Sequence, residues 1–287
     1  MPNIAIVTDS TAQFPNPNFA GKNNVRILPF DIILNGVRRI EGQDVKTADF
    51  PLTVRSSTDP KMVIPNPEDL AEFFSSLLRT YNELLVILSS ADLTLAYHNS
   101  IEAIKLIQAN TAIQVINSQT FSSGLGILVQ HGAELIARGA NLVEADRLLR
   151  QLIPHVYTLI CSPCLSYLHN SGAIEFHQAT VGEILNLYPI FSLEEGNLHA
   201  LCKVRNFRHA QDFFQEFIEE FEALSHISLI KGTNFQGIDN RLLRQFVMEF
   251  FPETPFSEHR LNPFHATLFG PKSVGLIVVE KPFSLSG

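Results

Sequence analysis

The sequence lacks several features that would point to particular classes of protein. It has no Trp and only 5 Tyr in 287 residues, and its 3 Cys are too few, and odd in number, for a disulfide framework. Against 29 Asp and Glu it has 21 Lys and Arg, a net charge of −8, without a cluster of basic side chains. This charge argues against nucleic-acid binding, which needs clustered cations. No apolar run reaches the roughly 18 residues that a membrane-spanning helix requires.

The first apolar run is also too short for a secretory signal. Ile4–Val7 leads directly to Asp9 and carries no preceding positive charge. Together with the absence of a disulfide framework, this predicts a cytoplasmic protein.

Phenylalanine is the one abundant aromatic residue, with 22 copies. Its ring has a large apolar area and no polar group that needs a partner. Two interpretations remain open, namely a core rich in Phe and an apolar cavity lined by Phe.

The N-terminal half alternates strand-like runs with helical patterns. The runs are uninterrupted, as expected of strands buried on both faces, and lie at Ile4–Thr8, Val25–Leu34, Leu84–Leu88 and Ile113–Ile116. Asn66 and Pro67 form a helix start, a second helix follows Ser122, and Asn141 opens a third after the stop at Gly139. This order predicts a mainly parallel sheet with flanking helices.

The pattern changes after about residue 155. Tyr188–Leu193 and Leu198–Val204 flank Gly196 as in an antiparallel hairpin. Helical stripes are expected at Phe213–Leu224 and Leu242–Phe251, with strands at Ile227–Ile230 and Val274–Val279. The fold class is therefore α/β with two lobes: an α/β domain over residues 1–155, an α+β domain over residues 156–287, and a ligand cleft between them.

Polar loops follow three of the predicted parallel strands. Ser10, Ser90 and Ser118 lie in these loops, and in an open parallel sheet a ligand binds beyond the carboxyl ends of the strands. Helix N-termini at such loops accept an anion such as a carboxylate. The alternative is that these hydroxyl side chains only cap helices and turns.

The sequence contains no recognisable catalytic or cofactor motif. A nucleophile elbow, a Walker lysine and a dinucleotide fingerprint are all missing. Gly124-Leu-Gly126 follows a loop rather than a strand and indicates close helix packing. Cys161 and Cys164 could form a redox pair or half of a zinc site, but two incidental buried thiols are favoured. We therefore expect no metal and no cofactor other than a bound lipid.

Several segments, taken in order, resemble the DegV family over nearly the whole chain. They are Ile4-Ala-Ile-Val-Thr-Asp-Ser-Thr-Ala12, Leu28-Pro-Phe30, Val115-Ile-Asn-Ser-Gln-Thr120, Ser123-Gly-Leu-Gly-Ile-Leu-Val129, Gly182-Glu-Ile-Leu-Asn-Leu-Tyr-Pro-Ile190, Lys203-Val-Arg205 and Gly270-Pro-Lys-Ser-Val-Gly275. The resemblance implies a two-domain α/β protein that encloses a fatty acid between its lobes. It also implies a partner, because such proteins present the acid to a separate fatty acid kinase subunit.

The resemblance further implies two loops that hold the acyl carboxylate. In Leu93-Thr-Leu-Ala-Tyr97, Thr94 aligns with the serine that binds the carboxylate in the family, and Tyr97 aligns with the family's tyrosine. In Pro60-Lys-Met-Val-Ile-Pro65, Met62 replaces the threonine that binds the carboxylate in the family, and Val63 follows it. An apolar rim of this kind would favour a neutral head group, such as an alcohol or an ester.

Two further departures concern the kinase-coupled role. Ala173 replaces a family arginine, and Leu268 replaces a histidine associated with acyl-phosphate handling. Lys203 and Arg205 remain as weak candidates to face a partner or a phosphate group. We predict a carrier or presenter of an acyl lipid rather than a stand-alone enzyme. The alternatives are a phosphotransfer component, a thiol oxidoreductase that uses Cys161 and Cys164, or a regulatory protein with a closed pocket.

Overall fold

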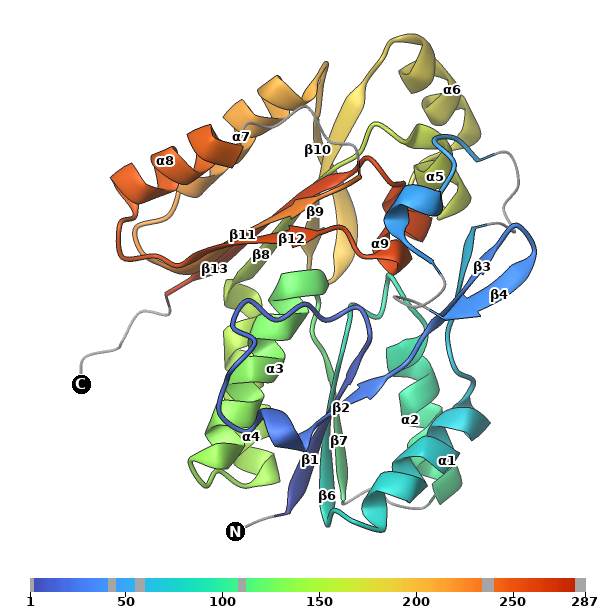
Figure 1. The fold of residues 1–287 in the computed structure, drawn as a ribbon, viewed down its shortest axis with the longest axis vertical. Helices are drawn as coiled ribbons and strands as arrows, with labels where there is room; N and C mark the ends of the chain where they lie inside the picture. Colours follow the sequence, from blue (N-terminus) through green and yellow to red (C-terminus); the bar gives the residue numbers. More distant parts are fainter. Residues whose placement is uncertain (1–2, 41–44, 55–59, 108–111, 234–239, 282–287) are drawn as a thin grey trace. The chain divides into compact units, whose positions relative to one another are not determined.

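A computed structural model describes residues 3–40, 45–54, 60–107, 112–233 and 240–281 (Figure 1). Grouped by their contacts, the residues form two compact units. The first comprises Met1–Phe30, Val63–Pro154 and Glu195–Asn197, and the second comprises Asp31–Met62, His155–Glu194 and Leu198–Gly287. Residues 31–62, expected in the first domain, thus group with the second unit.

The first unit is built on a four-stranded parallel sheet of order β2-β1-β6-β7. Its strands are β1 (Ile4–Asp9), β2 (Val25–Leu28), β6 (Glu83–Leu88) and β7 (Ile113–Asn117). Ile6 pairs with Val25 on one side and with Leu85 on the other. Every residue of β1 is buried, which explains its uninterrupted apolar run. The predicted parallel sheet is confirmed.

Helices cover both faces of this sheet, with α1 and α2 on one side and α3 and α4 on the other (Figure 1). They are α1 (Pro67–Leu78), α2 (Ala96–Ile107), α3 (Ser122–Ala137) and α4 (Leu142–Leu152). Two predicted caps are confirmed, since Asn66 Oδ1 accepts from Asp69 N–H at 2.8 Å and Asn141 Oδ1 from Glu144 N–H at 2.9 Å. α1, α2 and α3 begin at the sheet edge where the strands end, whereas α4 begins at the opposite edge, beside Glu83 at the start of β6.

The single strand predicted at Val25–Leu34 is wrong. The chain forms β2 and, after a break at Pro29, a separate strand β3 (Asp31–Leu34). Pro29 has no N–H to continue a ladder, and β2 ends where Leu28 C=O accepts from Ser10 N–H at 3.0 Å. β3 instead belongs to a three-stranded sheet of order β4-β3-β5, with β4 (Val37–Ile40) and β5 (Lys61–Val63).

The second unit contains a six-stranded mixed sheet of order β10-β9-β8-β13-β11-β12. The strands are β8 (Val156–Cys161), β9 (Tyr188–Glu194), β10 (Asn197–Val204), β11 (Leu224–Lys231), β12 (Phe256–Arg260) and β13 (Val274–Glu280). β11 and β12 are parallel, whereas β13 is antiparallel to both of its neighbours. The predicted hairpin is confirmed, with Glu195 and Gly196 at positive φ in its turn.

Five helices accompany this sheet in the described ranges. They are α5 (Leu165–Asn170), α6 (Phe176–Ile184), α7 (Phe207–Glu219), α8 (Asn240–Phe250) and α9 (Pro263–Phe269). The helix predicted at Phe213–Leu224 is misplaced. Asn206 caps its start by accepting from His209 N–H at 3.0 Å, and Leu224 already belongs to β11.

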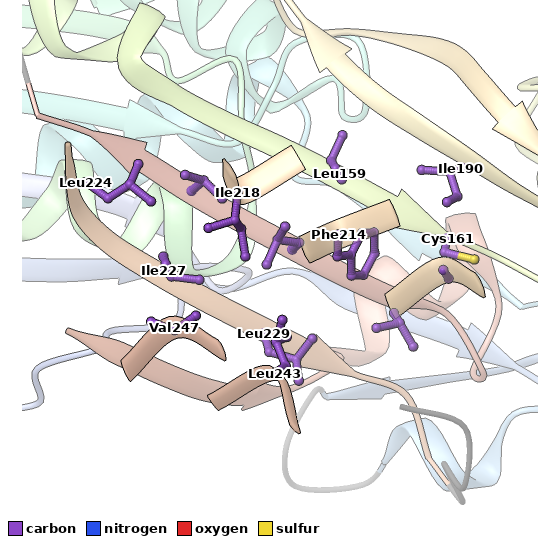
Figure 2. Close-up of a cluster of buried hydrophobic side chains, with 14 residues drawn as sticks. Leu159, Cys161, Ile190, Phe214, Ile218, Leu224, Ile227, Leu229, Leu243 and Val247 are labelled. Atoms are coloured by element: carbon purple, nitrogen blue, oxygen red, sulfur yellow. The ribbon is translucent and has the colours of Figure 1, made fainter. Parts of the chain in front are cut away.

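The core of the second unit lies between its sheet and helices α7 and α8. Phe214 and Ile218 of α7 meet Leu159 and Ile227 of the strands, and Leu243 of α8 closes the cluster (Figure 2). Further Phe rings pack around it, namely Phe207, Phe213, Phe217, Phe221, Phe246, Phe251 and Phe256. A core rich in Phe is therefore confirmed for this unit, whereas a cavity lined by Phe stays a prediction.

Candidate functional site

The end of β1 is tied to the end of β6 through the buried carboxyl group of Asp9. Its Oδ2 accepts from Ser89 N–H at 2.7 Å, and its Oδ1 accepts from Thr11 N–H at 3.0 Å and from the Thr11 hydroxyl at 2.5 Å. Burial raises the pKa of Asp9, and the hydrogen bonds from Ser89 and Thr11 act in the opposite direction. Asp9 therefore fixes the polar loops at the carboxyl edge of the sheet.

Thr94 lies next to this link, at the start of α2. Its Oγ1 accepts from Ala96 N–H at 3.3 Å and lies 3.4 Å from Ser89 Oγ, while the side chain is only 8% exposed. A hydroxyl group has two lone pairs and one hydrogen. In the contact between Ser89 and Thr94, either hydroxyl group can be the donor. The Thr94 hydroxyl thus caps the start of α2 and contacts the Ser89 hydroxyl.

The three predicted serines also lie at this edge of the sheet. Ser90 Oγ donates to Gly196 C=O at 2.8 Å, and Ser118 Oγ donates to Thr120 C=O at 3.2 Å. Ser10 Oγ accepts from Phe30 N–H at 3.1 Å. These bonds hold loops and turns together, so the structure brings Ser10, Ser90, Ser118 and Thr94 to one edge, where their hydroxyls also stabilise the loops.

The other predicted residues are more dispersed. Tyr97 is half-buried in the first turn of α2, with its ring edge-on to His98 at a centroid distance of 5.5 Å. Met62 and Val63 are half-buried in β5. Lys203 in β10 and Arg205 just after it are exposed.

Four residues at these strand ends and helix starts were not predicted as site residues. Thr11 and Ser89 carry the bonds to Asp9, as described above. Ser100 in α2 and Ser123 in α3 have buried hydroxyl oxygens without a hydrogen-bond partner in the part of the chain that the structure describes. Ser123 is the second residue of α3, whose preceding residue Phe121 supplies no side-chain cap. The sequence shows that the loops after the strands are rich in Ser and Thr. It does not reveal which of their hydroxyl oxygens have a hydrogen-bond partner.

Gly126 explains how closely the first loop approaches α3. A Cβ atom placed on Gly126 would lie 2.0 Å from Gln13 C=O, so no larger residue fits there. Ser122 C=O also accepts from Gln13 N–H at 3.0 Å. The close packing predicted for Gly126 is confirmed, and it fixes the Asp9 loop against the start of α3.

The cysteine pair does not have the environment of a reactive dithiol. Cys161 is buried in the core of the second unit (Figure 2), and burial raises its pKa. Burial also raises the pKa of Cys164 to about 11. Reactive cysteines have lowered pKa values, so this environment disfavours thiol chemistry. Across the described ranges, no group of three or more His, Cys, Asp or Glu side chains is arranged to hold a metal ion.

None of the described helices combines the length and the apolar character needed to cross a membrane.

Comparisons with known proteins agree on one family. The model of the uncharacterised DegV family matches residues 3–281. A DegV domain-containing protein of Caldanaerobacter subterraneus is 29% identical over 73% of this chain and 74% of its own length. A DegV domain-containing protein of Staphylococcus aureus is 23% identical over 96% of this chain and 98% of its own.

Solved structures share the fold. A fatty acid binding DegV family protein from Streptococcus agalactiae has a TM-score of 0.82 at 19% identity and covers 98% of this chain and 100% of its own. The fatty acid kinase B3 protein of Streptococcus pneumoniae, solved with linoleic acid, has a TM-score of 0.81 at 16% identity, with 98% and 100% coverage. Since the family model covers almost the entire chain, this protein belongs to the DegV family.

Proposed function

We propose that the protein binds a long-chain fatty acid or a related acyl lipid and acts as a carrier or presenter, not as a stand-alone enzyme. The observation that carries this proposal is the linked set Asp9, Ser89 and Thr94, which places buried hydroxyl groups at the carboxyl edge of the parallel sheet. The DegV proteins solved with linoleic acid and with heptadecanoic acid support an acyl ligand.

The acyl tail supplies most of the binding free energy in this proposal. Burial is worth about 0.8 kcal/mol per methylene, or roughly 12 kcal/mol for a chain of about sixteen carbons before association costs. A hydrogen bond at the head contributes only about 1–3 kcal/mol. In this proposal the tail therefore contributes most of the affinity, and Thr94 determines where the head group lies and which head groups are accepted.

Two positions argue against a kinase partner. Ala173 and Leu268 are both half-buried, and they stand where the family resemblance implied an arginine and a histidine. The exposed Lys203 and Arg205 are the remaining candidates to face a partner or a phosphate group. A carrier of this kind would work in the cytoplasm, with the lipid shielded from water.

Extraction of the purified protein with organic solvent, followed by mass spectrometry, tests the carrier role. We expect an acyl lipid in a ratio of about one to one. Absence of any lipid, together with failure to bind a fluorescent fatty acid, would instead favour the regulatory protein with a closed pocket.

Replacing Thr94 with Val tests the head-group site. Loss of the buried hydrogen bond should weaken lipid binding by about 1–3 kcal/mol, or roughly 5- to 150-fold in Kd. The matched control is Thr80→Val, at an exposed threonine of the same unit. An affinity equal to that of the control would remove Thr94 from the site.

A further inference from the structure

We propose that the groove between α7 and α8 of the second unit is a docking site for a basic amphipathic helix of another protein. Such a site adds a protein partner to the proposed lipid ligand. It is separate from the proposed head-group residues Ser89 and Thr94, which belong to the first unit.

The groove runs between two helices that pack over the same face of the six-stranded sheet (Figure 1). It has a volume of about 640 Å³. One wall is formed by Arg208, Gln211, Asp212 and Gln215 of α7, and the other by Leu242, Gln245, Phe246 and Glu249 of α8. The lining residues span about two turns of each helix, which suits a partner helix of two to three turns.

The α8 helix has a second apolar row besides the one that faces the core. Leu243 and Val247 pack into the core and are 0% and 1% exposed. Leu242, Phe246 and Phe250 repeat every four residues along the flank of the helix; Leu242 and Phe250 are 52% and 56% exposed. A surface helix needs one apolar stripe for its own core. The second row has the spacing at which an amphipathic helix packs into a groove.

The wall opposite this row is acidic. Asp212, Glu216 and Glu219 are exposed along α7, in which Arg208 is the only Lys or Arg. Glu249 adds a carboxylate on α8. Within the described ranges, none of these five side chains forms an ion pair. Unpaired acids beside an apolar row favour a partner that carries Lys or Arg next to its apolar side chains.

The same charges disfavour a second copy of this chain as the occupant. In a symmetric contact each patch meets its own copy, so Asp212 and Glu249 would face the same acids across the interface. The net charge of −8 adds to this repulsion. We therefore assign the groove to a different, basic partner.

The test uses two fluorescein-labelled peptides of about 18 residues, long enough for a stable amphipathic helix. One is made of Leu and Lys, and the other has Glu in place of every Lys. Fluorescence anisotropy with the full chain, at pH 7.5 and about 0.15 M salt, measures binding. We expect the basic peptide to bind with a Kd on the order of 10 μM and the acidic peptide at least about tenfold more weakly.

Two variants test the two walls. Leu242→Ser should weaken binding of the basic peptide about tenfold, because it removes an apolar contact at the groove. Glu249→Lys should weaken the basic peptide and strengthen the acidic one, each by about three- to tenfold. Met248→Ser is the matched control, since Met248 is 65% exposed on the same helix and does not line the groove.

Three outcomes would overturn the proposal. The first is a basic peptide that binds no more tightly than the acidic one. The second is an equal loss of binding in Leu242→Ser and Met248→Ser, because the peptide would then lie elsewhere. The third is a dimer of the wild type, seen by sedimentation velocity, that Leu242→Ser dissociates, because the groove would then hold a second copy. Since the assay needs no lipid, each outcome leaves the proposed function standing.

Discussion

Replacement of His226 with Gln should make the second unit more resistant to acid. His226 lies on β11, and its Nε2 is 2.9 Å from Ser257 Oγ on the neighbouring strand β12. The same hydroxyl lies 2.9 Å from Ser228 Oγ and 3.0 Å from His259 Nε2. Two imidazoles thus share one serine between parallel strands.

This cluster disfavours protonation of His226. Burial lowers its pKa to about 4, with a further contribution from His259, whose own pKa is also lowered by burial. The unfolded chain binds the proton near pH 6.5, so the stability that depends on neutral His226 is complete above that pH. It is lost as the pH falls toward 4. A difference of about 2.5 pKa units corresponds to roughly 3 kcal/mol, of which about 2–3 kcal/mol is lost by pH 4.5.

Glutamine keeps a polar group for Ser257 but cannot titrate. The free energy of unfolding of His226→Gln should therefore lie within about 1 kcal/mol of the wild-type value at pH 7.5. Between pH 7.5 and 4.5 the variant should lose about 2–3 kcal/mol less than the wild type. Urea unfolding followed by far-ultraviolet circular dichroism, at four pH values across this range, measures the difference.

His131→Gln serves as the control, because His131 is exposed on α3 in the other unit. Its dependence on pH should match that of the wild type. If His226→Gln loses as much stability in acid as the wild type does, the buried cluster does not restrain protonation, and the reasoning is refuted.

Two further predictions concern the core and the cysteines. Phe214→Ala should destabilise the second unit by about 3–5 kcal/mol in urea unfolding, because the ring is fully buried between α7 and the sheet. A loss no greater than that of the half-buried Phe213→Ala would contradict this packing. Iodoacetamide at pH 8 should label the half-buried Cys202 well before Cys164, whose pKa is raised to about 11. Mass spectrometry of peptides would show the order, and equal rates would argue against a buried Cys164 thiol.

Much of the fold could be predicted because its signals are local. Asn66 and Asn141 cap helices through an N–H three residues ahead, and Gly196 turns a hairpin between adjacent strands. The run Ile4–Thr8 is apolar throughout because both faces of β1 are covered. The caps and the turn join residues that are close in sequence. The strand is recognised from its own run of apolar residues.

The predictions were wrong where a local sequence pattern was compatible with more than one secondary structure or element boundary. Val25–Leu34 has the composition of one long strand, but Pro29 ends β2 and lets Asp31 enter a different sheet. The apolar stripe through Phe213 runs on past Glu219, the last residue of α7, although Leu224 already forms a strand. Tertiary pairing decided these limits, since a short apolar run suits either a helix or a strand.

By itself, the sequence determined that hydroxyl-rich loops follow the parallel strands, and it predicted that a head group would bind at that edge of the sheet. Only the tertiary structure decided what each hydroxyl does there. Asp9 bonds to Ser89, 80 residues away, and Ser90 bonds to Gly196, 106 residues away. These partners are set by the strand order β2-β1-β6-β7 and by the hairpin turn, which no local pattern encodes. That order places the buried hydroxyl of Thr94 beside that of Ser89, which is the physical basis of the proposed site.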